Sequence, residues 1–238
     1  MQPEQEQEIL NLRDRQLTPK QIARKLGLKA SEVSTFLISQ AEQTALASAE
    51  KGELLPVAQC LVDVNFANAL LRNETTEAGG LGLVMVTRSK GYNRFVATTY
   101  LIDYWCLGVK DTIPPRNCND SQYKNLVEHS YSPFLGYEEI SLEQAQALVW
   151  GAIAYAKTLG FEPHRDFEQS KAHLGELTSE IGLKFGRNGQ PCYVEGHYDN
   201  TKKIINTLKN SVGDGNFDYL CGVEIDTGSS TTEPIESW

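Results

Sequence analysis

Two aspartates and a cysteine stand at the end of an apolar segment of this 238-residue chain. The run TTYLI (98–102) is followed by Asp103, Cys106 and Asp111. A buried strand that ends here would deliver these polar groups to the surface. Two carboxylates at one strand end can hold a divalent metal ion, as in metal-dependent nucleases and hydrolases. A continuous strand would hold the two aspartates far apart, so this chemistry requires a bend near Gly108. The simpler alternative is a strand with a polar exposed end and a surface ion pair between Lys110 and Asp111.

The same segment offers a nucleophile. Cys106 is a candidate for covalent catalysis with His164 or His129 as its general base. Its neighbours Trp105 and Leu107 are apolar, and a cysteine in such surroundings is more often part of the core.

A third group combines metal-binding residue types within ten positions, namely His164, Asp166 and His173. Their spacing matches no standard helical ligand pair, and polar residues of a solvated loop explain them as well. We therefore expect no metal site and no cofactor, with a divalent metal ion only if the chain is a hydrolase centred on Asp103 and Asp111.

A different kind of site is predicted near the amino terminus, in TPKQIARKLGLKASEVSTFLI (18–38). Thr18, Pro19 and Gln21 predict a capped helix start, and Gly27 predicts a bend between two short helices. The expected buried positions are Ile22, Ala23, Leu26, Leu28, Val33, Phe36 and Leu37. This pattern resembles the helix-turn-helix of bacterial regulators and sigma-factor-like domains over about the first 45 residues.

Charge favours DNA as a partner of this module. Between Arg13 and Gln40 the chain has six basic and two acidic residues, an excess that suits phosphate contact. The outward side of the second helix has no arginine to read guanine, so specific readout would depend on serine and threonine. The predicted nucleic-acid contacts are Lys20, Arg24, Lys29, Ser31, Ser34 and Thr35. A protein partner is the alternative.

The remainder of the chain is acidic. Residues 1–52 are neutral in sum, whereas residues 53–238 carry the whole formal net charge of −9, which repels nucleic acid. No apolar run approaches the length of a membrane span, and the start MQPEQEQE lacks the apolar core of a secretory signal. The five cysteines form no CxxC pair. These features predict reduced thiols, a cytoplasmic location and no membrane contact.

The expected fold class is α+β, with a small all-α helix-turn-helix domain at 1–50 and an α+β domain with an antiparallel or mixed sheet at 54–225. A disordered tail is expected at 226–238, where serine, threonine and acidic residues dominate. Hydrophobic patterning predicts strands at 54–64, 81–89 and 92–109, with a hairpin around Lys90 and Gly91. It also predicts an irregular loop at 110–136 that contains a short helix at 122–129, and helices at 141–160 and from 200 or 201.

Three blocks of the main domain are distinctive: LIDYWCLGVKD (101–111), GAIAYAKTLGFEPHRDF (151–167) and FGRNGQPCYVEG (185–196). They resemble a family of uncharacterised bacterial proteins, and the resemblance covers roughly residues 81–210. Members of that family often end in a zinc-binding tail like that of SecA. Such a tail is missing here, where Cys221 stands alone. The resemblance implies a shared fold and a cytoplasmic setting but no activity.

Three functions fit these observations. The first is a DNA-binding or regulatory helix-turn-helix protein whose acidic domain docks or senses. The second is a metal-dependent nuclease or hydrolase, and the third is an interaction subunit of a larger complex. Bound metal would favour the second, and salt-dependent duplex binding would favour the first. The sequence leaves the oligomeric state open.

Overall fold

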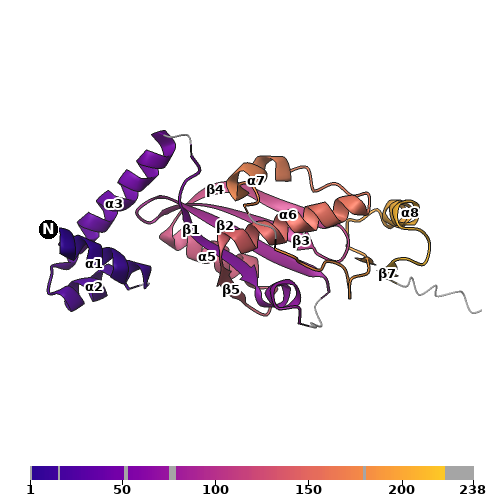
Figure 1. The fold of residues 1–238 in the computed structure, drawn as a ribbon, viewed down its shortest axis with the longest axis horizontal. Helices are drawn as coiled ribbons and strands as arrows, with labels where there is room; N and C mark the ends of the chain where they lie inside the picture. The colour runs from indigo at the N-terminus through magenta and orange to yellow at the C-terminus, as the bar shows by residue number, and fades with distance from the viewer. Residues whose placement is uncertain (1, 16, 51–52, 75–78, 179–180, 223–238) are drawn as a thin grey trace, which may run out of the picture.

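The computed structural model describes residues 2–15, 17–50, 53–74, 79–178 and 181–222, and it places three helices before an α+β domain (Figure 1). The elements in chain order are α1 (Pro3–Asp14), α2 (Pro19–Leu26), α3 (Ala30–Glu50), β1 (Val57–Asp63), α4 (Val64–Phe66), the π-helix η1 (Ala67–Leu71), β2 (Leu81–Gly91), β3 (Arg94–Asp103), β4 (Gly108–Asn119), α5 (Asp120–Tyr131), β5 (Tyr137–Ile140), α6 (Leu142–Thr158), α7 (Phe167–Leu174), β6 (Cys192–Val194), α8 (Thr201–Ser211) and β7 (Asp218–Leu220).

Five strands form one sheet in the order β4-β3-β2-β1-β5. Every neighbouring pair in this sheet is antiparallel, so the predicted α+β class is confirmed and its sheet is antiparallel. Strands β6 and β7 form a separate parallel pair.

Helices cover both faces of the sheet, with α6 on one face and α5 on the other (Figure 1). Successive residues of a strand point to opposite faces, so alternate positions enter two different clusters. The cluster under α6 includes Val62, Val84, Tyr100, Ile102 and Leu148. The cluster under α5 includes Leu61, Leu83, Met85, Val127 and Tyr131.

The prediction of one strand over 92–109 is wrong, because the chain reverses inside it. Strand β3 ends at Asp103, residues 104–107 form a turn, and β4 begins at Gly108. Gly108 has φ +70°, and a Cβ at this position would lie 2.7 Å from the Cβ of Ala156 in α6. Only glycine meets both demands without strain, so this residue fixes where the bend occurs.

The irregular loop predicted over 110–136 is also wrong, whereas the short helix predicted within it at 122–129 is confirmed and lies in α5. Strand β4 continues to Asn119, and α5 follows directly. Pro114 and Pro115 disfavoured a strand in the sequence, but β4 is an edge strand, where missing N–H donors are tolerated. The register of β4 against β3 shifts at these prolines. The side chains of Asn119 and Gln122 then form a capping box that starts α5.

Locally encoded elements agree with the sequence. The helix predicted over 141–160 is α6, and Ser141 caps it in a box with Gln144. The hairpin expected at Lys90 and Gly91 joins β2 to β3, with Tyr92 and Asn93 at its tip.

The tail predicted to be disordered at 226–238 lies outside the described residues. Within the part of the chain that the structure describes, no helix combines the length and apolar content needed to cross a membrane.

Helices α1 to α3 form a module with its own apolar core, called here the N-terminal module. Its buried side chains are Ile9, Leu12, Ile22, Ala23, Val33, Phe36 and Leu37, and Leu26 and Leu28 pack against them. Tyr92, at the β2–β3 tip, packs against the same cluster and connects the module to the sheet. The predicted cap at Thr18, Pro19 and Gln21 is present at the start of α2.

Gly27→Val is expected to loosen the N-terminal module and leave the main domain intact. Gly27 has φ +65° and ψ +27°, and no atom lies within 4 Å of a Cβ built on it. The penalty is therefore one of backbone conformation, about 1–2 kcal/mol for a β-branched residue in the left-handed region. Hydrogen exchange should become faster in α2 and α3 only. Gly27→Asn is the control, since asparagine tolerates this conformation, and equal exchange in Gly27→Val and the wild type would refute the role of this turn.

Candidate functional site

The start of α2 and the turn before α3 present basic side chains to solvent. Lys20 and Arg24 are exposed and lie four residues apart, so they share one side of α2. Lys29 is exposed in the turn, with its Nζ 3.9 Å from a carboxylate oxygen of Glu32. The polar side chains predicted to contact bases lie in the first two turns of α3: Ser31 and Thr35 are exposed and Ser34 is half-buried.

Glu32 reduces the positive charge of this surface. Its carboxylate accepts the backbone N–H of Lys29 at 3.4 Å and so satisfies a donor next to the start of α3. An acidic group here opposes a phosphate that approaches the same helix end.

Asp103 is part of the β3–β4 turn. Its side chain is only 4% exposed, and Oδ1 accepts the backbone N–H groups of Trp105 at 3.0 Å and Cys106 at 2.9 Å. Burial raises the pKa of the Asp103 carboxyl to about 6, although those N–H groups and Lys110 oppose the shift. Through these hydrogen bonds Asp103 stabilises the β3–β4 turn.

Cys106 lies in an apolar cluster with Leu107, Leu159, Tyr193 and others. Burial raises the pKa of its thiol far above the usual range, and the nearby Asp103 adds to the shift. A nucleophile needs the thiolate, which these surroundings disfavour. His129, one of its two proposed bases, is exposed on α5.

The three residues His164, Asp166 and His173 do not form one site. His173 is buried near the end of α7, where its Nε2 lies 3.2 Å from the carbonyl oxygen of Val86. Burial lowers the pKa of His173 to about 4, and Arg88 contributes to the shift. This histidine is thus a neutral core residue.

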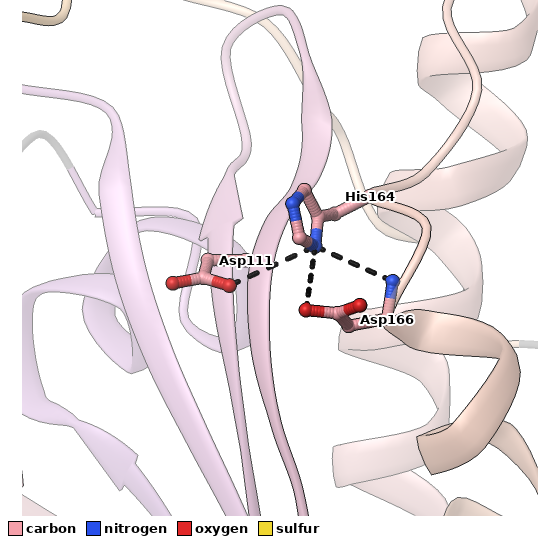
Figure 2. A group of neighbouring side chains, drawn as sticks. All are labelled: Asp111, His164 and Asp166. Carbon is pink, nitrogen blue, oxygen red and sulfur yellow. Dashed lines mark hydrogen bonds and ion pairs between the residues drawn. The ribbon is translucent and has the colours of Figure 1, made fainter. Parts of the chain in front are cut away.

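His164 and Asp166 instead meet Asp111, and Figure 2 shows the three side chains converging. Nδ1 of His164 lies 3.7 Å from Oδ1 of Asp111 and 3.7 Å from Oδ2 of Asp166. One ligand atom from each residue lies within 4.8 Å of the other two. We call these three residues the Asp–His–Asp cluster. Within the described residues it is the only such group of three or more potential metal ligands.

Backbone hydrogen bonds hold the Asp–His–Asp cluster together. The N–H of His164 donates to the carbonyl of Val109 at 2.9 Å, which ties the loop after α6 to β4 two residues before Asp111. The carbonyl of His164 accepts the N–H of Phe167 at 2.9 Å, which fixes the entry into α7. The N–H of Thr112 donates to Oδ1 of Asp111 at 2.8 Å.

Lys110 does not form the surface pair with Asp111 that the sequence allowed. Its Nζ lies 2.9 Å from Oδ2 of Asp199, and the N–H of Gly196 donates to the same oxygen at 2.8 Å. Burial would raise the pKa of the Asp199 carboxyl, but these donors outweigh it and lower the pKa. Asp111 is thereby left to face His164.

Sequence reasoning named each member of the Asp–His–Asp cluster but did not group them. Spacing along the sequence groups Asp111 with Asp103, and His164 with Asp166 and His173. The contact depends on the hydrogen bond between His164 and Val109, which connects segments far apart in the chain. A pattern of residue spacings covers only short separations along the chain, so it does not detect a site formed by two distant segments.

Two surfaces of the chain therefore combine exposure with chemistry that fits a ligand: the basic side of the N-terminal module and the Asp–His–Asp cluster. Comparison with protein-family models, curated proteins and solved structures found no match for the chain.

Proposed function

We propose that the protein binds duplex DNA through its N-terminal module, used as a helix-turn-helix, and that the acidic domain senses or docks. The observation that carries this proposal is the arrangement of α2, the left-handed turn at Gly27 and α3, with basic and hydroxyl side chains exposed at the helix starts. In a helix-turn-helix the second helix enters the major groove and its first residues contact base edges.

The placement of charge supports the same proposal. The module lies at one end of the molecule, away from most of the main domain (Figure 1), and the net negative charge belongs to residues 53–238. DNA on the module therefore avoids most of the repulsion from that domain, which falls off over about 10 Å at moderate salt. Lys20, Arg24 and Lys29 supply the phosphate contacts, and Ser31, Ser34 and Thr35 supply a weak base preference.

The alternative of a hydrolase centred on Asp103 and Asp111 receives less support. Asp103 is buried and its Oδ1 serves the β3–β4 turn, whereas Asp111 is exposed beside His164. Metal-assisted chemistry in this domain would have to begin from Asp111, His164 and Asp166 instead.

Replacing Lys20, Arg24 and Lys29 together with glutamine is expected to weaken duplex binding at least about tenfold for all sequences alike. The slope of log affinity against log salt should fall by up to about 3, since each lost phosphate contact removes about 0.9. Fluorescence anisotropy of a labelled duplex over a range of salt concentrations measures both. The matched control is Lys184, Lys202 and Lys203 to glutamine, which makes the same charge change away from the module.

Two further variants separate readout from charge. Glu32→Gln should strengthen binding, because it removes the acid that opposes phosphate at the start of α3.

Ser34→Ala with Thr35→Ala should change the preference between sequences and leave the salt slope unchanged. If neither the basic nor the hydroxyl set alters affinity, DNA binding by this surface is refuted, and docking of the module on a protein becomes the better explanation.

A further inference from the structure

We infer that Asp111, His164 and Asp166 form a binding site for a divalent transition-metal ion. The inference is independent of DNA binding by the N-terminal module. It rests on the type, spacing and fixed placement of three donor groups that come from two separate segments of the chain.

The donor set suits such an ion. One imidazole nitrogen with two carboxylate oxygens is a mixed set that zinc, manganese and iron accept. Ligands about 2.1 Å from a common ion lie roughly 3–4 Å from one another. The distances of 3.7 Å from Nδ1 of His164 to each carboxylate agree with this separation, and they are long for direct hydrogen bonds.

Nδ1 of His164 faces both carboxylates, and a cation would bind it in place of its long contact with the backbone N–H of Asp166. The backbone N–H of Asp166 points to Nδ1 at 3.4 Å, so Nδ1 is the acceptor nitrogen of the ring (Figure 2). Three electron-rich atoms then converge on one point, an arrangement that a cation stabilises. The competing explanation is a protonated His164 that pairs with both carboxylates without a metal ion.

The site is held ready by the fold and open to solvent. Asp111 is on β4, and the hydrogen bond from His164 to Val109 holds the opposite ligands against that strand. The side chain of Asp111 is 61% exposed and those of His164 and Asp166 are each 35% exposed, so an ion can enter and keep water as further ligands. Arg165 lies 3.7 Å from Oδ1 of Asp166, which leaves Oδ2 for the ion.

Zinc is the probe, added to the full-length, chelator-treated protein under reducing conditions and followed by isothermal titration calorimetry. The wild type should bind one Zn²⁺, and its melting temperature should rise with the ion. Asp111→Asn, His164→Gln and Asp166→Asn, each made singly, should weaken binding at least about tenfold and remove the rise. Circular dichroism of each metal-free variant checks that it is folded, and three separate variants keep the test valid if one is not.

The controls are His129→Gln, an exposed histidine on α5, and Cys221→Ser, the one cysteine among the five that is not buried. Both should bind Zn²⁺ as the wild type does. The inference is overturned if the wild type takes up no stoichiometric Zn²⁺, if the three ligand variants bind as tightly as the wild type, or if either control abolishes binding. The first of these results would leave the protonated His164 pair as the explanation of the cluster.

Discussion

Asp103→Ala is expected to be about 3 kcal/mol less stable to unfolding than Asp103→Asn. A single oxygen of Asp103 accepts two backbone N–H groups, and an asparagine amide keeps one such oxygen. Alanine leaves both donors without a partner, namely the part-buried N–H of Trp105 and the buried N–H of Cys106. Urea denaturation followed by tryptophan fluorescence measures the difference, and Trp105 reports from within the turn.

The loss in Asp103→Ala should spread to residues 185–196. The carbonyl of Tyr104 accepts the N–H of Gly186, and the carbonyl of Trp105 accepts the N–H of Cys192. Hydrogen exchange should therefore become faster in this segment as well as in the turn. Equal stability of the alanine and asparagine variants would show that the carboxylate does not organise the turn.

The pH dependence of stability provides a separate test of the role of Asp103. Its pKa of about 6 in the folded protein exceeds the ordinary value of 3.8, so the folded state binds the proton more tightly. The contribution of Asp103 to the free energy of unfolding therefore falls as pH rises from about 4 to about 6, by at most about 3 kcal/mol. Asp103→Asn should gain this amount relative to the wild type over that interval.

Only the difference in the free energy of unfolding between wild type and variant isolates the contribution of Asp103. His173 has its pKa lowered to about 4, so the unfolded state binds its proton more tightly. Its contribution to stability rises as pH increases from about 4 to about 6.5, opposite in sign to that of Asp103. Because both proteins contain His173, its effect cancels in the comparison.

Asp63→Ala should lower the free energy of unfolding by about 3–5 kcal/mol, because two buried N–H groups lose their acceptor. Asp63 is fully buried; Oδ1 accepts the N–H of Phe66 at 3.0 Å and Oδ2 accepts that of Leu83 at 2.7 Å. Its two oxygens serve different elements, α4 and β2. Burial raises the pKa of this carboxyl, and the same N–H groups oppose that shift.

Asparagine should destabilise the protein at this position, although we expect it to be tolerated at position 103. The Asn amide offers one oxygen and one NH2 group, so one of the two N–H groups would face another donor. We expect Asp63→Asn to remain at least about 1–2 kcal/mol less stable than the wild type in urea denaturation. If Asp63→Asn were as stable as the wild type, the two-oxygen arrangement would be disproved.

Features that depend on residues close together in the chain were predictable from the sequence. The capping boxes at Thr18 and Ser141 and the bend at Gly27 depend on side chains a few positions apart, and the structure contains all three. The buried positions of the N-terminal module and of α6 follow from helical periodicity in the same way.

Features that depend on distant partners were not predictable. The β3–β4 turn spans residues 104–107, and Gly108 after it has no room for a side chain because Ala156 of α6 lies against it. Strand β4 tolerates its two prolines because it is an edge strand among the described residues and its ladder with β3 is interrupted beside them. Asp111 meets His164 only after the loop beyond α6 has attached to β4. Periodicity and propensity contain no information about such contacts.

The edges of the five-stranded sheet also affect the tendency of the protein to self-associate at high concentration. Pro114 and Pro115 deprive the outer strand β4 of two backbone donors, so an incoming strand from another molecule would find an interrupted ladder. At the opposite edge, β5 has only four residues and includes Glu138 and Glu139. Both ends of the sheet therefore resist edge-to-edge addition, and we expect self-association or amyloid-like growth by extension of this sheet to be suppressed.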